Sequence, residues 1–147
     1  MRANNNQRIL IIDKNHVWRK WAYSVLSENG YVVVEGSTFA KARKGIEKNP
    51  DCLVLISVDI AKSNLADVKI MAGKKVKRPA KFLVISPIRL SYNDLRDLWL
   101  SGVVDIQRKP RNKKVLLDLV GNEFDLGNGN KSSKENSNLK PSLAGGY

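Results

Sequence analysis

The stretch "DCLVLISVDI", residues 51–60, decides the fold that we expect for this chain. Its centre, residues 52–58, is a continuous apolar run, which is typical of a strand covered on both faces of a parallel sheet. Ser57 and Asp59 stand at the end of this run. Ligands of doubly wound sheets gather at the carboxyl ends of the strands. Both residues are therefore candidates for a functional site.

Segments of strand and helix character alternate on both sides of this run. Short apolar or β-branched stretches predict four further strands, at residues 8–12, 31–36, 82–86 and 103–107. Apolar residues at helical spacing predict helices at residues 15–30, 38–48, 62–73 and 91–102, and a last one from the N-cap Asn112 through 120. Five strands alternating with five helices predict an α/β fold, a doubly wound five-stranded parallel sheet of the flavodoxin-like (βα)5 type.

The same pattern predicts the domain boundaries and part of the core. In the helix at 15–30, Val17, Trp18 and Trp21 fall within the arc that we expect to face the sheet. We expect residues 1–7 to be flexible and residues 8–124 to form one domain. Residues 125–147 are rich in Gly, Ser, Asn and Lys without apolar spacing, which predicts a disordered tail.

The composition restricts the class of protein. Cys52 is the single cysteine, so an internal disulfide framework and a cysteine-based zinc site are excluded, and we expect a cytoplasmic location. No apolar run is long enough for a membrane span. The net charge of +12 favours an anionic partner, which could be nucleic acid, anionic lipid or an acidic protein.

Four of the predicted strands end in residues that suggest a shared site. Asp13 and Lys14 follow the first strand, Ser57 ends the third, Ser86 ends the fourth, and Lys109 follows the fifth. With the motifs "ILIID", "FLVIS" and "SGVVDIQRKP", this order resembles the receiver domain of bacterial two-component response regulators, the CheY-like superfamily. The resemblance covers residues 8–120, essentially the whole part that we expect to fold.

The resemblance implies a phosphorylation chemistry that this chain departs from. Receivers hold Mg²⁺ on an acidic pair after the first strand and phosphorylate an aspartate after the third, and a hydroxyl and a lysine then contact the phosphoryl group. Asp13, Ser86 and Lys109 match the first acid, the hydroxyl and the lysine, whereas Lys14 replaces the second acid. Counting without gaps from Ala42 puts Ser57 at the acceptor position, and a shift by one residue would put Ile56 there.

The local charge indicates whether the site can bind Mg²⁺ as the site of a phosphorylated receiver does. Lys14 and Ser57 in place of two carboxylates change the local charge by three units, and Mg²⁺ sites are built from anionic oxygens. One pair of unit charges at about 4 Å is worth about 4 kcal/mol at an effective dielectric of about 20. We therefore expect a pseudo-receiver without metal, cofactor or catalytic residue: a phosphorylation-independent protein-interaction module in bacterial signalling.

Alternatives remain at individual residues. Asp59 could accept a phosphoryl group, as in a conventional response regulator. Because Asp59 lies two residues beyond Ser57, we rank this function last. We expect the Asp59 side chain to pair with a lysine. Lys109 is either a switch lysine or the permanent ion-pair partner of Asp13, and we favour the ion pair. Ser86 is expected to form local hydrogen bonds.

The basic residues form two groups in the sequence. One group belongs to the rim at the carboxyl ends of the strands, where Arg89, Arg108, Arg111 and Lys113 are candidate contacts for an anion or a partner. The other precedes the fourth strand and comprises Lys74, Lys75, Lys77, Arg78 and Lys81. Placement on opposite edges argues against one continuous groove. A nucleic-acid-associated transcriptional regulator is nevertheless the main alternative function, and a generally basic surface is the simplest explanation.

Two leucines lie outside the apolar sides of the helices that contain them. Leu100 and Leu117 belong to the fourth and fifth helices of the receiver pattern, through which receiver-like proteins commonly dock partners or a second copy. They are our candidates for a docking face toward a signalling protein or within a homodimer.

Overall fold

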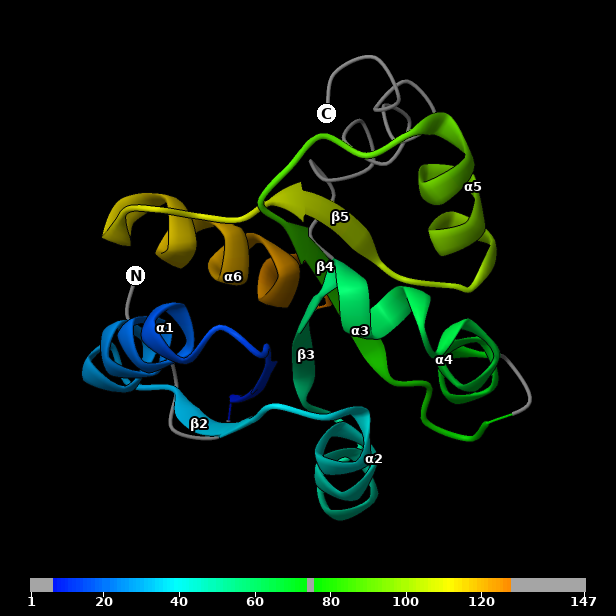
Figure 1. The fold of residues 1–147 in the computed structure, drawn as a ribbon. Helices are drawn as coiled ribbons and strands as arrows, with labels where there is room; N and C mark the ends of the chain where they lie inside the picture. Colours follow the sequence, from blue (N-terminus) through cyan, green and yellow to red (C-terminus); the bar gives the residue numbers. More distant parts are fainter. Residues whose placement is uncertain (1–6, 74–75, 128–147) are drawn as a thin grey trace. The chain divides into compact units, whose positions relative to one another are not determined.

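The sheet has the parallel arrangement that the sequence predicts (Figure 1). The computed structural model describes residues 7–73 and 76–127. Its strands run in the order β2-β1-β3-β4-β5, the flavodoxin-like order, and all four pairings are parallel. They are β1 (Arg8–Ile12), β2 (Val32–Gly36), β3 (Leu53–Ser57), β4 (Lys81–Ser86) and β5 (Asp105–Arg108). The predicted fold class is therefore confirmed.

The contacts of the chain define two compact units, Met1–Lys109 and Pro110–Tyr147. The first contains the sheet and α1 (His16–Glu28), α2 (Phe39–Lys48), α3 (Val58–Lys62), α4 (Leu65–Ala72) and α5 (Tyr92–Leu100). In this unit α1 covers one face of the sheet, and α2 to α5 cover the other (Figure 1). The second unit contains α6 (Lys113–Gly127).

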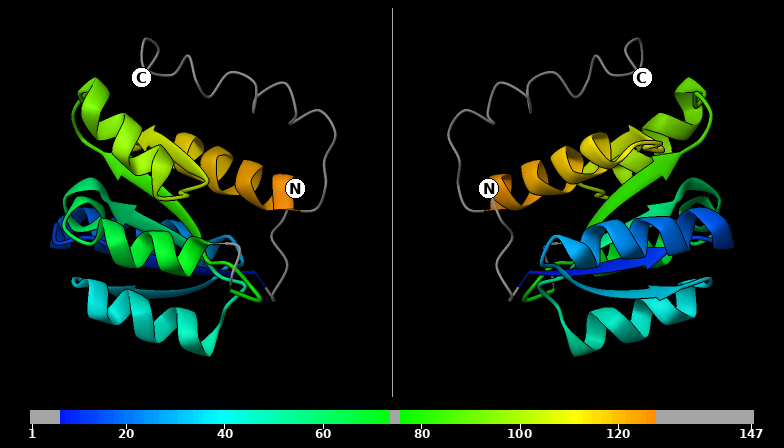
Figure 2. Two further views of the ribbon diagram at one scale, coloured as in Figure 1. Left: turned by 90° about the vertical axis from the view of Figure 1, so that its right-hand side faces the viewer. Right: turned by 90° about the vertical axis from the view of Figure 1, so that its left-hand side faces the viewer.

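Local sequence explains where the main helices begin and end. Asn15, Thr38 and Ser91 are N-caps whose side chains accept hydrogen bonds from the backbone of the first turn of α1, α2 and α5. After α1 the chain turns at Gly30, whose φ of 95° suits a residue without a side chain. The side views of Figure 2 show α2 alongside β2 at the edge of the sheet.

The core is built on the three inner strands. Every side chain of β3 is buried, and β1 and β4 are buried beyond their first residues. Phe39 of α2 stacks on Phe82 of β4 with ring centroids 6.4 Å apart, which joins the helix to the sheet. Cys52 is buried beside β3, and burial raises the pKa of its thiol to about 11. It therefore behaves as a small apolar core residue.

One predicted helix is wrong. Residues 62–73 were expected to form a single helix, but α3 begins at Val58, directly after β3, and a break at residues 63–64 separates it from α4. Val58, Ile60 and Ala61 are buried, so the apolar run of the strand continues into the helix without a visible change. Helix α3 ends at its C-cap Ser63, and the side-chain amide of Asn64 donates to the Ile60 carbonyl at 2.8 Å.

The expected core arc of α1 also needs correction. Val17 is 78% exposed, and Trp18 and Trp21 are only half-buried. The buried residues of this helix are Ala22, Val25 and Leu26. Helical spacing identified the correct side of the helix, but the buried part of that side is narrower than the predicted arc and lies in the second half of α1.

The last helix is longer than predicted. Asn112 is its N-cap as expected, since its side chain accepts from Val115 N at 2.9 Å. The helix continues past 120 to Gly127, so residues 125–127, which were assigned to the tail, are helical. Phe124 extends the apolar spacing of Leu117 and Val120 and accounts for the added turns. Residues 1–6 and 128–147, which belong to the segments predicted to be flexible and disordered, lie outside the described residues. Gln7 was also predicted to be flexible, but its carbonyl accepts a hydrogen bond from Val32 N at 3.0 Å beside β2.

Among the described helices, none combines the length and the apolar character that a bilayer crossing requires.

Candidate functional site at the carboxyl ends of the strands

The fold brings four of the predicted site residues to one edge of the sheet. Asp13 follows β1, Ser57 is the last residue of β3, Ser86 is the last residue of β4, and Lys109 follows β5. The register supports this alignment, because Ile12 lies opposite Ile56 and Ser86 lies opposite Arg108. The strand ends therefore meet as the sequence predicted.

Lys109 and Asp13 form the ion pair that the sequence analysis favoured. Lys109 Nζ lies 2.8 Å from Asp13 Oδ2, and the two side chains are only 13% and 5% exposed. The Lys109 ammonium also lies 4.8 Å from the centroid of the Trp18 ring, where a cation–π interaction is favourable. Its backbone N–H donates to the Ser86 carbonyl at 2.8 Å, which fixes the start of the side chain.

Both oxygens of the Asp13 carboxylate are engaged. Oδ1 accepts from Asn15 N at 2.9 Å. Oδ2 is buried and receives no hydrogen bond of regular geometry, so the charge of Lys109 is what stabilises it. A buried carboxylate in this state depends on its cation, because removal of one partner from a buried pair costs about 3–5 kcal/mol.

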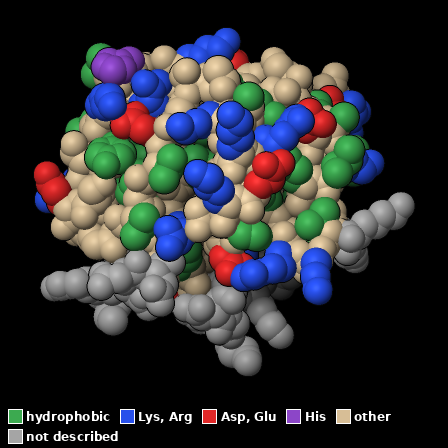
Figure 3. Space-filling view, turned by 90° about the horizontal axis from the view of Figure 1, so that it is seen from below, with side chains coloured by type: hydrophobic (Ala, Val, Ile, Leu, Met, Phe, Trp, Pro, Cys, Tyr) green, Lys and Arg blue, Asp and Glu red, His purple; other side chains and the backbone are tan. Residues whose placement is uncertain are grey.

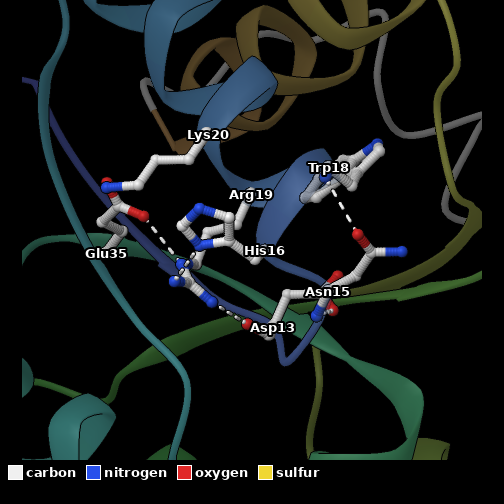
Figure 4. A network of polar contacts seen from close by, with 7 residues as sticks. All are labelled: Asp13, Asn15, His16, Trp18, Arg19, Lys20 and Glu35. Atoms are coloured by element: carbon white, nitrogen blue, oxygen red, sulfur yellow. Dashed lines mark hydrogen bonds and ion pairs between the residues drawn. The ribbon is translucent and has the colours of Figure 1, made fainter.

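A second network holds the loop after β1 against β2, and sequence reasoning missed it (Figure 4). Arg19 of α1 donates to the Asp13 carbonyl through Nη1 at 2.7 Å and to Glu35 Oε1 through Nε at 2.7 Å. Lys20 Nζ lies 2.8 Å from Glu35 Oε2. The signal available in the sequence was the acid Glu35 near the end of β2 together with the adjacent cations Arg19 and Lys20 in α1.

The charges around Glu35 keep it ionised. Burial acts to raise the pKa of Glu35, but the hydrogen bonds and charges of Lys20 and Arg19 together outweigh burial and lower it. His16 lies at the edge of the same network, with its Nδ1 3.3 Å from Arg19 Nη2, and it is exposed (Figure 4). The network therefore positions Asp13 from its backbone side, while Lys109 holds its carboxylate.

The residues that would complete a metal site do not fit one. Lys14 is exposed beside Asp13, and Ser57 supplies a hydroxyl, not a carboxylate, at the end of β3. Ser57 is 9% exposed, and its side chain does not cap the following helix α3. Within the described part of the chain, no three His, Cys, Asp or Glu side chains converge where they could hold a metal ion. This donor set does not suit Mg²⁺.

Asp59 lies on α3 and is exposed. We expected it to pair with a lysine, but it forms no ion pair with any residue in the described ranges, so this expectation is wrong. The reason is the early start of α3, which turns Asp59 outward on a helix. The nearby cation Lys62 pairs with Asp94 of α5 instead, at 3.0 Å.

Ser86 is completely buried, and local hydrogen bonds occupy its hydroxyl. Oγ donates to the Ile88 carbonyl at 2.7 Å and accepts from Ile88 N at 3.2 Å. The expected local role of this hydroxyl is therefore confirmed, and it stabilises the turn after β4.

The structure shows how exposed the remaining predicted contact residues are. Arg89 and Arg108 are exposed in the first unit, and Arg111 and Lys113 are exposed in the second. Leu100 of α5 is 67% exposed, whereas Leu117 of α6 is half-buried and belongs to the second unit. The anion contacts and the docking face stay predictions.

Comparison with known proteins identifies the fold. No protein-family model and no curated protein matches the sequence. Among solved structures, a CheY-like response regulator receiver domain protein from Methanospirillum hungatei matches with a TM-score of 0.68 and 20% identity, over 81% of this chain and 94% of that one. A signal receiver domain from Bermanella marisrubri matches with a TM-score of 0.66 and 21% identity, over 78% and 95% of the two chains.

A response regulator from Thermotoga maritima gives a TM-score of 0.66 at 17% identity, over 79% of this chain and 95% of that chain. Since these matches span nearly the whole of each solved chain, the chain has the receiver fold. At this level of identity the similarity establishes the fold, and the function has to be argued from the site.

Proposed function

We propose that this protein is a non-catalytic, receiver-like interaction module of bacterial signal transduction that works without phosphorylation. The observation that carries the proposal is the buried Lys109–Asp13 ion pair beside Trp18, at the edge where the receiver fold normally holds its metal and acceptor carboxylates. In this chain a cation and a hydroxyl, Lys14 and Ser57, take the place of two acids.

Electrostatics supports the loss of phosphotransfer. The charges of Asp13, Lys14 and Ser57 sum to zero, whereas two acids at the latter positions would give a sum of −3. A divalent cation gains its affinity from such anionic oxygens. Ser57 has no carboxylate, so it cannot form an acyl phosphate, and phosphorylation of its hydroxyl would instead need a protein kinase and would give an ester.

The geometry supports a fixed surface. A phosphoryl switch requires a hydroxyl and a lysine that are free to change partners. Here the Ser86 hydroxyl is bound within its own turn, and Lys109 is held by Asp13. The module would then recognise its protein partner through a surface whose shape is constant, and regulation would come from the amount or location of the module.

Intact mass measurement after incubation with Mg²⁺ and a small phosphodonor such as acetyl phosphate tests this function. We expect the mass to stay unchanged, because the chain lacks both the metal site and the acceptor. A phosphorylatable receiver in the same tube serves as the positive control. A gain of one phosphoryl group on this chain would overturn the proposal. Localisation of that group to Asp59 would support the function of a conventional phosphorylated response regulator.

A further inference from the structure

Helix α2 carries a row of exposed lysines outside its buried side. Lys41, Lys44 and Lys48 are separated by three and four residues, so they lie along one side of the helix. Phe39, Ala42 and Ile46 form the buried side. All three lysines are exposed, and none pairs with an acid within the part of the chain that the structure describes.

The row continues at the end of α2 to Arg8, the first residue of β1. Arg8 and Lys48 line one hollow of about 140 Å³, together with Asn49, Pro50 and Asp51. Arg8 is exposed and has no ion-pair partner in the described ranges. We call the set of Arg8, Lys41, Lys44 and Lys48 the α2 stripe.

Neighbouring acids do not neutralise the α2 stripe. Asp67 is paired with Arg43 at 2.9 Å, and Asp51 is paired with Arg78. Glu47 is the one exposed acid of α2 itself. Figure 3 looks onto the side where α2 lies, and it shows many Lys and Arg side chains there with Asp and Glu between them. The four cations of the stripe therefore outweigh a single free carboxylate.

We propose that the α2 stripe binds the phosphate backbone of duplex nucleic acid. A helix rises about 1.5 Å per residue, so Lys41 to Lys48 span about 10 Å. Duplex DNA presents one charge per about 1.7 Å of its axis, so several phosphates face a stripe of this length. Flexible lysines contact such phosphates as point charges and carry no sequence preference.

The chemistry of the α2 stripe selects this partner over other polyanions. The stripe contains no aromatic residue on which the bases of a single strand could stack. It also contains no large apolar residue that could enter a lipid headgroup layer. The α2 stripe includes none of the residues of the candidate site at the carboxyl ends of the strands, so this inference does not rest on the proposed function. It also differs from the rim and from the loop before β4, the two basic groups that were apparent in the sequence.

Fluorescence anisotropy with a labelled random-sequence duplex of about 20 base pairs tests the proposal on the full chain, over about 50–200 mM salt. The triple variant Lys41→Gln, Lys44→Gln, Lys48→Gln should bind about tenfold or more weakly at low salt, and its slope of log K against log salt should be smaller by about 3. Glutamine has a helix propensity similar to that of lysine, so the fold should be retained, and thermal unfolding checks this.

The matched control is Lys14→Gln, Lys69→Gln, Lys77→Gln, which loses the same charge from exposed lysines elsewhere. Lys14 belongs to the rim and Lys77 to the loop before β4, so this variant also tests those two surfaces. We expect its affinity to fall by less than about twofold at matched salt. An equal loss in both variants, no binding by the wild type, or binding only to the labelled single strand would overturn the proposal. Binding to vesicles with one fifth phosphatidylserine but not to the duplex would do the same.

Discussion

At the scale of single residues, the pair Lys109–Asp13 is the most deeply buried ion pair among the described residues. Lys109→Met keeps the aliphatic stem beside Trp18 but removes the charge, so Asp13 remains buried without a cation. We expect the free energy of unfolding in urea to fall by about 3 kcal/mol. The double variant Asp13→Asn, Lys109→Met should recover most of this loss, because both charges are then absent. Equal stability of the single and double variants would show that the pair is not coupled.

The sequence predicted this pair because two features were independent of side-chain detail. The alternation of strands places residues 13 and 109 at the same sheet edge, and the absence of neighbouring acids leaves each as the natural partner of the other. The Arg19–Glu35 contact was not predicted. It depends on the rotation of α1 over β2, which apolar spacing defines only within a broad arc.

At the scale of elements, Gly45 shows how closely α2 packs on the sheet. A Cβ at this position would lie 2.7 Å from Leu10 Cδ2, and Leu10 is 2% exposed and cannot move aside freely. Gly45→Ala would gain about 1 kcal/mol of helix propensity. Overpacking costs about 1–3 kcal/mol, so we expect a net loss of stability of about 1 kcal/mol, measured by urea unfolding.

Gly121 of α6 provides the matched control for Gly45. A Cβ there would meet no atom within 4 Å, so Gly121→Ala should raise the free energy of unfolding by about 0.5–1 kcal/mol. Opposite signs for the two variants would confirm that packing against Leu10, and not helix propensity, determines the effect at Gly45. A gain in both would show that α2 can shift away from the sheet.

The elements also show which parts of the secondary structure the sequence pattern predicts and which it does not. All five strands were predicted to within about two residues, because buried parallel strands are apolar runs bounded by polar turns. The connection after β3 was not, because Val58 and Ile60 add apolar residues directly after the strand, and no change in apolar spacing marks the C-cap of α3 at Ser63. The lysines of α2 were visible in the sequence. Their importance required knowledge of which acids are already paired.

At the scale of the whole molecule, the parallel sheet of the receiver fold positions the residues of the site. Asp13, Ser57, Ser86 and Lys109 come from four strand ends far apart in the sequence, and the parallel sheet alone brings them together. Under the proposed function, the sheet supplies the backbone of the site, while Lys14 and Ser57 do not supply the carboxylates that attract a metal. This separation between scaffold and charge can be tested directly.

The variant Lys14→Asp, Ser57→Asp changes the summed charge of positions 13, 14 and 57 from 0 to −3. We expect Mg²⁺ to cause a saturable change in tryptophan fluorescence in this variant and none in the wild type, because Trp18 lies beside Lys109 at the same edge. The control Lys14→Asn, Ser57→Asn supplies oxygen ligands of similar shape without charge, and it should remain unresponsive. If the wild type responded as strongly as the acidic variant, the replaced charges would not be what excludes the ion.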